Sequence, residues 1–183
     1  MILLVHSCDS CLWLREHWER YFDKSGWYAN VEYLLGEGEF SDRLIEALEG
    51  ITDEYVWYTL DDYFITQPID WFKYEKMAIE INADVLRVQP NVQIDSLPYR
   101  FKWAGDLLKQ RPDSAYTMSM QTSIWRRKYF LECLTPGLDP WELEGMRPKL
   151  GDVYFVPQLP FWYIDAVRKG VLTDKGKKMI DGI

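Results

Sequence analysis

The feature of this chain that most constrains its fold is an apolar run that ends abruptly in two acids. Residues 55–60 are β-branched and aromatic, a composition typical of a buried strand, and Asp61 and Asp62 follow at once. Two adjacent carboxylates at the end of such a strand are costly to bury without a partner. A divalent cation is one such partner, because hard cations prefer carboxylate oxygens. The alternative is a polar strand end that opens into a turn.

The segments around this strand predict an α/β domain. Apolar runs at 1–5 and 30–35 predict two more strands, and amphipathic patterns over 12–22 and 41–48 predict helices that end at Gly26 and Gly50. The order strand, helix, strand, helix, strand is typical of a mostly parallel sheet flanked by helices. We find no linker or internal repeat, so we expect a single domain over residues 1–183.

The second half of the chain continues this pattern with less regularity. Helices are predicted over 69–81 and 126–134, strands over 84–88, 116–124 and 153–156, and a short helix at the carboxyl end. Residues 91–112 combine aromatic and basic side chains with prolines, which predicts either a loop over a site or a β-hairpin insertion.

Composition excludes several classes of function. A net charge of −8 and a pI near 4.8 argue against a general attraction to nucleic acid or anionic membranes. No apolar run is long enough to span a bilayer, and an odd number of cysteines without a signal peptide fits a reducing cytoplasm. Cys8 and Cys11 form a CxxC pair, but His6 and His17 are the only histidines, which disfavours a zinc site. The oligomeric state is not indicated.

Acidic residues follow two of the predicted strands. Asp9 comes after the first strand, and Asp61 and Asp62 come after the central one. Ligands of parallel α/β sheets bind at the carboxyl ends of the strands, so this placement favours a ligand site. Asp9 could instead cap the helix that follows it.

Four stretches in this order resemble small bacterial and viral glycosyltransferases of the GT-A type. They are residues 7–9 after the first strand, residues 40–44 leading into the acidic stretch 61–64, residues 121–126 with 140–144, and residues 165–170. The resemblance implies a GT-A-like, Rossmann-like nucleotide-binding domain. It also implies a nucleotide-sugar donor, a Mn²⁺ or Mg²⁺ ion at the acid pair, and an acceptor hydroxyl that we expect to belong to a saccharide.

The resemblance assigns the donor site. Asp61 and Asp62 would bind the metal, which with a nearby cation would neutralise the charge that develops on the leaving nucleoside diphosphate. The donor-binding candidates are Ser7, Asp9, Arg43, Asp61, Arg168 and Lys169. Each basic residue could instead be an ordinary surface charge. Many GT-A enzymes place a late histidine on the metal, whereas this chain has none after His17, so water, the second Asp or the diphosphate would complete the coordination.

The acceptor side of the site is expected around residues 139–145. Glu142 and Glu144 are the candidates for the base that takes the acceptor proton. On an extended segment they would point opposite ways, and we favour Glu142. Its alternative role is to pair with Arg126 or Arg147. Trp125 and Trp141 would stack on sugars or belong to the core.

Three other functions compete with glycosyl transfer. A sugar-phosphate nucleotidyltransferase shares this α/β plan but normally has a Gly-rich, basic loop after the first strand, unlike residues 7–10. A non-catalytic carbohydrate-binding module could keep the same fold. A transferase that acts on modified DNA is disfavoured by the net charge.

Overall fold

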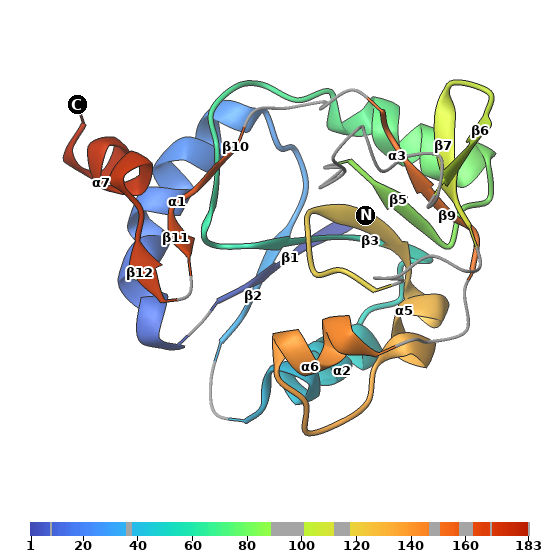
Figure 1. Ribbon diagram of the computed structural model, residues 1–183, viewed down its shortest axis with the longest axis horizontal. Helices are drawn as coiled ribbons and strands as arrows, with labels where there is room; N and C mark the ends of the chain where they lie inside the picture. The colour runs from blue at the N-terminus through green and yellow to red at the C-terminus, as the bar shows by residue number, and fades with distance from the viewer. Residues whose placement is uncertain are drawn as a thin grey trace.

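The computed structural model describes residues 1–7, 9–35, 38–88, 101–111, 118–146, 151–157, 163–168 and 170–182, with the backbone alone for 9–11 and 101–103. Its centre is an eight-stranded sheet in the order β2-β1-β3-β8-β5-β9-β7-β6 (Figure 1). These strands are β1 (Ile2–His6), β2 (Val31–Leu34), β3 (Tyr55–Leu60), β5 (Val85–Arg87), β6 (Phe101–Ala104), β7 (Leu107–Gln110), β8 (Ser123–Arg126) and β9 (Val153–Phe155).

Two two-stranded ladders and a set of helices complete the fold. β4 (Tyr63–Ile65) pairs with β10 (Tyr163–Asp165), and β11 (Val167–Arg168) pairs with β12 (Val171–Leu172). The α-helices are α1 (Arg15–Phe22), α2 (Phe40–Gly50), α3 (Trp71–Glu80), α5 (Arg127–Cys133), α6 (Pro140–Gly145) and α7 (Asp174–Asp181). Short 3-10 helices, η1 (Asp9–Leu14) and η2 (Asp23–Ser25), flank α1. None of the helices in the described part of the chain is long and apolar enough to cross a membrane.

The strand directions confirm the predicted mostly parallel sheet. β1 is parallel to both β2 and β3, and β5 is parallel to β9. β8 runs antiparallel between β3 and β5, and β7 runs antiparallel to β9 and forms a hairpin with β6. The β6–β7 hairpin forms part of the irregular stretch 91–112. Gly105 has a φ of 62°, which allows the tight turn between the two strands of this hairpin. Residues 89–100 and 112–117 lie outside the described residues.

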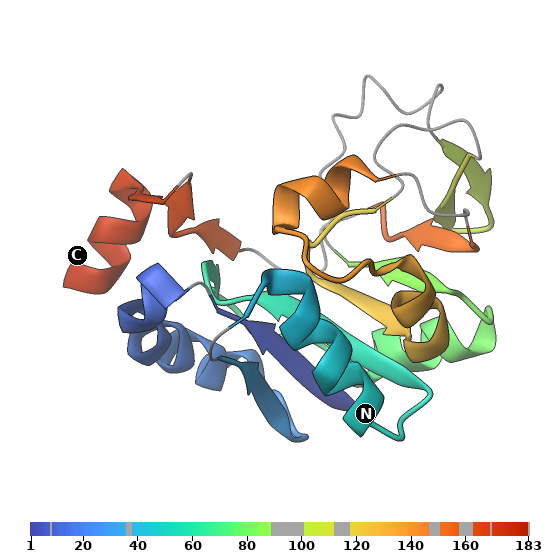
Figure 2. The same ribbon diagram turned by 90° about the horizontal axis from the view of Figure 1, so that it is seen from below.

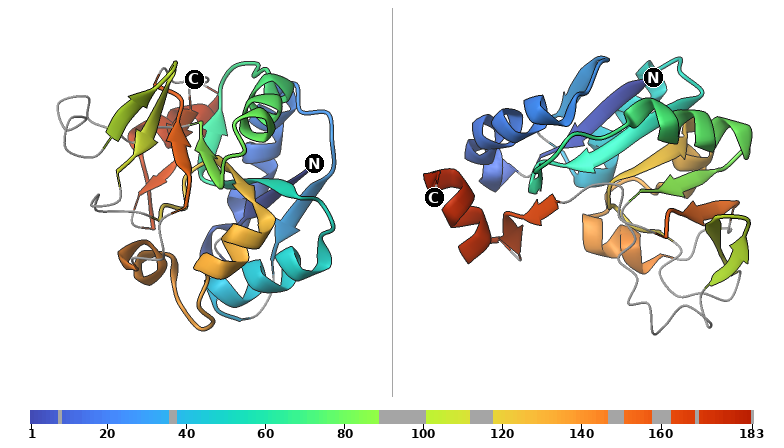
Figure 3. Two further views of the ribbon diagram at one scale, coloured as in Figure 1. Left: turned by 90° about the vertical axis from the view of Figure 1, so that its right-hand side faces the viewer. Right: turned by 90° about the horizontal axis from the view of Figure 1, so that it is seen from above.

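Helices cover both faces of the sheet, which explains why β3 is apolar throughout. Successive side chains of β3 point to opposite faces. Trp57 packs edge-on against Trp71 of α3, with ring centroids 4.8 Å apart. Tyr58 packs against Phe130 of α5 on the other face, at 5.6 Å. Figure 3 shows the resulting layers, with α1 and α3 on one side and α2 and α5 on the other.

The carboxyl-terminal segment returns to the edge at which β1 and β3 end. β10 pairs with β4, and the backbone N–H of Ala166 donates to the carbonyl of Asp62 at 2.8 Å. α7 then lies beside α1, where the Tyr21 hydroxyl donates to the carbonyl of Met179 at 2.9 Å (Figure 2). Residues more than a hundred positions apart therefore meet at this edge of the sheet.

Trp125 of β8 allows a direct test of this packing. Its side chain is fully buried and stacks on Phe130 at 4.1 Å. We expect Trp125→Ala to lower the free energy of unfolding by about 3–5 kcal/mol, since the loss of a large buried ring leaves a cavity. The control is Phe72→Ala on α3, which removes an aromatic ring that is 66% exposed and should change the value by less than about 0.5 kcal/mol. Equal effects of the two substitutions in urea unfolding would contradict the layer assignment.

Candidate functional site

Asp61 lies at the end of β3 and is almost completely buried. Its carboxylate accepts a hydrogen bond from the Ser7 hydroxyl, and its backbone N–H donates to the carbonyl of His6 at 3.2 Å. Burial raises the pKa of Asp61 to about 6, while the bond from Ser7 opposes that rise. The structure thus brings the predicted residues Ser7 and Asp61 into contact.

Asp62 is the less satisfied member of the pair. Its Oδ1 atom is buried and has no hydrogen-bond partner in the part of the chain that the structure describes. Burial, followed by the charges of Asp61 and Asp165, raises its pKa to about 7. Asp165 is nearby because β10 pairs with β4 and places Asp165 opposite Tyr63. Sequence reasoning included Asp165 in a matching stretch but gave it no role, since only strand pairing reveals that it lies near Asp62.

Glu144 lies on the same side of the molecule as these acids. Its Oε1 atom accepts a hydrogen bond from the backbone N–H of Met120 at 2.8 Å. Burial raises the pKa of both Tyr58 and Tyr63, and the negative charges of Glu144 and Asp62 add to the rise in each case. The phenol rings of β3 and β4 therefore lie within electrostatic reach of both Glu144 and Asp62.

Glu142 has a different and structural role. It occupies the first turn of α6, where its carboxylate accepts from the backbone N–H of Asp139 at 3.0 Å. The Asp139 carboxylate in turn accepts from the N–H of Glu142 at 2.8 Å, which completes a capping box. Arg126, one predicted partner of Glu142, instead contacts Glu54 at 2.6 Å, and Arg147 lies outside the described residues.

The segment that carries both glutamates is therefore helical, and the extended conformation that we expected is wrong. An Asp followed by Pro and, at the third position, Glu is a known helix-start pattern, with Pro favoured at the first helical position. That signal was present in the sequence at Asp139 and Pro140. The geometry gives no support to the preference for Glu142 over Glu144 as a base, because Glu142 is exposed and engaged in the cap.

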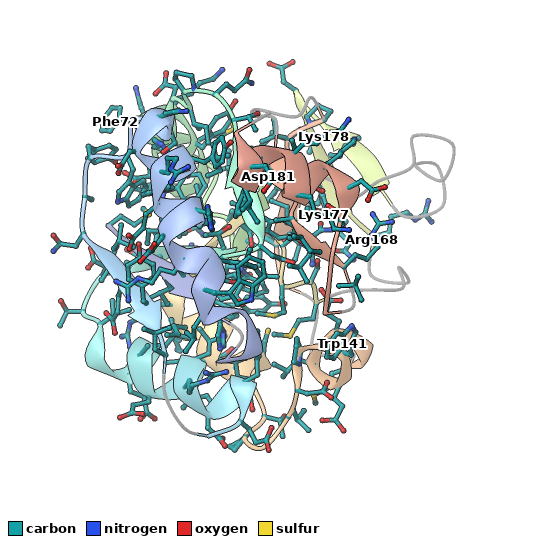
Figure 4. All side chains as sticks on the ribbon, turned by 90° about the vertical axis from the view of Figure 1, so that its left-hand side faces the viewer. Phe72, Trp141, Arg168, Lys177, Lys178 and Asp181 are labelled. Atoms are coloured by element: carbon teal, nitrogen blue, oxygen red, sulfur yellow. The ribbon has the colours of Figure 1, made fainter. Side chains whose placement is uncertain are left out.

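The two tryptophans expected to stack on sugars have opposite environments. Trp125 is buried between core rings and its indole N–H donates to Ser123 at 2.8 Å, so of its two expected roles it has the one in the core. Trp141 is 70% exposed on α6, and Figure 4 shows it at the surface. Only Trp141 of this pair offers a face to a ligand.

The predicted cations are divided between two places. Arg168 of β11 is largely exposed (Figure 4). Its Nη2 lies 3.3 Å from the Asp165 carboxylate. Arg43 of α2 lies near His6, whose pKa is lowered to about 3 by burial and then by the charge of Arg43. His6 is therefore neutral and stacks on Phe40 at 3.6 Å. Lys169 lies outside the described residues, as does the side chain of Asp9, whose backbone begins η1.

The resemblance predicts a metal ion at the acid pair. Asp61 and Asp62 offer hard oxygen atoms, and Oδ1 of Asp62 is an acceptor without a hydrogen-bond partner among the described residues. Among the described residues, no group of three or more His, Cys, Asp or Glu side chains is arranged to hold a metal ion. The pair could therefore bind a cation only if water or a ligand supplied the remaining positions.

Asp62 should make the stability of the protein depend on pH. Because its pKa is raised from the usual 3.8 to about 7, the folded state favours the protonated carboxyl group. The contribution of this group to stability is full below pH 4 and is lost as the pH rises towards 7. We expect Asp62→Asn to exceed wild type in free energy of unfolding by about 1–3 kcal/mol at pH 8, and to show no such excess near pH 4.

Urea unfolding in a buffer containing EDTA, at pH 4, 6 and 8, measures this difference. Asp106→Asn is the matched control, since Asp106 is exposed in the turn between β6 and β7. The same pH dependence in wild type and Asp62→Asn would contradict the burial of this carboxylate.

Comparison with known proteins identifies similar folds but no similar sequences. No protein-family model matches the chain, and no curated protein matches it. The fold is similar to that of TarS from S. aureus, residues 1–349. Its complex with UDP-GlcNAc has a TM-score of 0.62 at 12% identity, covering 93% of this chain and 60% of that one. Its complex with UDP has a TM-score of 0.58 at 12% identity, covering 88% and 59%.

A third structure, of TarS 1–349, has a TM-score of 0.56 at 16% identity and covers 88% of this chain and 59% of that one. The chain therefore spans about three-fifths of the length of the TarS chains it matches. At these identities the likeness concerns the fold, and it confirms the expected GT-A-like α/β architecture.

Proposed function

We propose that this chain is a glycosyltransferase that moves a sugar from a nucleotide-sugar donor to a hydroxyl group of a saccharide acceptor. The observation that carries the proposal is the acid pair at the carboxyl edge of the sheet, in which Asp61 is buried and Asp62 is half-buried with one orphaned, buried carboxylate oxygen. Such an edge is where α/β sheets bind ligands. The similar fold of TarS, solved with UDP-GlcNAc and with UDP, supports a nucleotide sugar as the donor.

The residues of the acid pair fit a divalent cation. Asp62 would bind the cation through its orphaned Oδ1. The hydrogen bond from Ser7 would keep the Asp61 carboxylate in position. A bound Mn²⁺ or Mg²⁺ ion neutralises the negative charge that develops on a leaving diphosphate. Arg168 is largely exposed and pairs with Asp165, and it would have to leave that ion pair to bind a diphosphate, which would not disturb the core.

Glu144 is the better candidate for the base. Its carboxylate lies near the phenol rings of Tyr58 and Tyr63 and thus near the acid pair, whereas Glu142 caps the helix. The acceptor oxygen would lose its proton to Glu144 as it bonds to the anomeric carbon and the diphosphate departs. Trp141, exposed on the same helix, offers an aromatic face on which a sugar ring of the acceptor could stack.

A panel of nucleotide sugars with Mn²⁺ tests the proposal. We expect the protein to release nucleoside diphosphate from at least one donor, slowly to water and faster with a saccharide acceptor. Pyrophosphate-dependent exchange would identify a sugar-phosphate nucleotidyltransferase instead. Binding of saccharides with no turnover of any donor would identify a carbohydrate-binding module. Either result would overturn the proposal.

Binding of the diphosphate should depend on both the cation and the acid pair. We expect UDP with Mn²⁺ to raise the melting temperature by several degrees, because a ligand at one hundred times its Kd adds about 2.7 kcal/mol of stability. UDP with EDTA should change the melting temperature little. Asp62→Asn should lose the part of the increase in melting temperature that depends on Mn²⁺. Asp106→Asn, the exposed control, should keep it. A full shift in Asp62→Asn would show that the cation binds elsewhere.

The two glutamates of α6 should separate chemistry from stability. We expect Glu144→Gln to lower kcat by about 10²–10⁴-fold with little change in donor binding, since general-base assistance has this value and the base touches only the acceptor. Glu142→Gln should keep near-normal turnover and lose only about 0.3–1 kcal/mol of stability, because it removes a negative charge from the first turn of the helix while the glutamine amide can still complete the capping box. Steady-state kinetics and urea unfolding of both variants measure this. A large loss of kcat in Glu142→Gln and near-normal turnover in Glu144→Gln would identify Glu142 as the base.

A further inference from the structure

A cavity lies between α1 and the edge strand β2, apart from the acid pair. Its volume is about 340 Å³, at the lower end of the range for small-molecule sites. It is lined by Glu19, Phe22, Asp23, Trp27, Val31 and Tyr33. Val31 begins β2, and the strand register places it level with Trp57 of β3, four residues before Asp61. The cavity is therefore set back from the carboxyl edge of the sheet and is separate from the candidate site.

One wall of the cavity, Trp27, is held in place by an aromatic cluster. Trp27 stacks on Tyr28 with ring centroids 5.4 Å apart, and it packs edge-to-face with Trp71 at 5.0 Å. The Tyr28 hydroxyl donates to the buried carboxylate of Glu75, which also accepts from the indole N–H of Trp57 at 3.1 Å. These contacts fix the indole of Trp27, so the cavity is largely preformed.

Negative charge gathers at this cavity. Glu19 and Asp23 contribute carboxylates, and the carboxyl end of α1 adds a partial negative charge between them. The Nε of Arg15 pairs with Glu19 at 2.9 Å, whereas none of the ion pairs within the described part of the chain involves Asp23. Lys24 lies over the ring of Tyr21, which does not line the cavity. A positively charged ligand would therefore balance a charge that the nearby basic residues leave in place.

One end of the cavity wall already binds a guanidinium group. The guanidinium carbon of Arg15 lies 3.9 Å from the centre of the Tyr33 ring, while its Nε pairs with Glu19. Aromatic faces attract cations, and carboxylates form strong hydrogen bonds with them. Trp27 and Asp23 provide the same combination of a ring and a carboxylate on the rest of the wall.

We propose that this cavity is a binding site for a small organic cation, an ammonium, amidinium or guanidinium group carried on an apolar frame. The positive group would bind Asp23, and the frame would pack on Phe22 and Trp27. The site does not depend on glycosyl transfer, so this inference and the proposed function can each fail without the other.

Benzamidine and benzamide form a matched pair of probes for this site. The two molecules have nearly the same shape, but only benzamidine is positively charged at pH 7. Each is titrated into the ¹⁵N-labelled protein at low ionic strength, and the Kd is measured from the indole N–H peak of Trp27. That peak is assigned by its loss in Trp27→Phe, which keeps an aromatic ring in the cluster.

We expect benzamidine to shift the Trp27 peak with a Kd of about 0.1–10 mM, the range for a ligand of its size. Benzamide should bind at least about fivefold more weakly, because it lacks the charge that Asp23 and the rings attract. Asp23→Asn should weaken benzamidine binding by about 2–5-fold, the value of an exposed charge pair, and leave benzamide binding unchanged. Asp106→Asn is the matched control, the same exposed change in the β6–β7 turn, and should not alter either Kd.

Three results would overturn the inference. Equal Kd values for benzamidine and benzamide would show a site that does not select positive charge. An unchanged benzamidine Kd in Asp23→Asn, or equal losses in Asp23→Asn and Asp106→Asn, would show that the cation is attracted by the net charge of the protein and not by this carboxylate. A Trp27 peak that benzamidine does not shift would show that this cavity does not bind it.

Discussion

The desolvation of two neighbouring carboxylates at the end of β3 is the constraint on which the rest of the structure depends. β3 is packed on both faces, so it carries Asp61 and Asp62 to the edge of the sheet with little access to water. Ser7 satisfies part of Asp61, whereas Oδ1 of Asp62 has no partner within the described chain. Such an arrangement lowers stability at neutral pH. Carboxylates with raised pKa values in such a position are typical of ligand sites.

The other parts of the candidate site converge on this pair from distant parts of the chain. β10 returns from the carboxyl-terminal segment and brings Asp165 and, beyond it, Arg168 to the edge where β1 and β3 end. α6 brings Glu144 from the opposite side of the sheet, where the helix cap of Asp139 and Glu142 fixes its start. In the proposed function, the acids act together with a segment that would offer a cation to the diphosphate and a helix that would offer a carboxylate to the acceptor. The proposed transfer reaction requires separate groups for the donor and the acceptor, because the two substrates must approach one carbon atom from different sides.

Local sequence patterns predicted the features that depend on neighbouring residues. The strand at 55–60, its terminal acids and the helices of the first half follow from periodicity and glycine stops, and the structure agrees with them. The conformation around α6 was missed although its capping pattern was present, since Glu142 and Glu144 were expected on an extended segment. The burial of Trp125 was not predictable, because a core and a surface tryptophan look the same in one sequence. Asp165 gains its significance only from the β4–β10 pairing, which joins residues far apart in the chain.

A crystal structure of the protein grown with UDP and Mn²⁺, with anomalous scattering recorded at the manganese edge, tests the central claim most directly. The account predicts one strong anomalous peak in direct contact with the carboxylate of Asp62 or Asp61, bridged to the diphosphate of UDP at the carboxyl edge of the sheet. A manganese ion and a diphosphate bound elsewhere, with both carboxylates still buried and without a ligand, would contradict it.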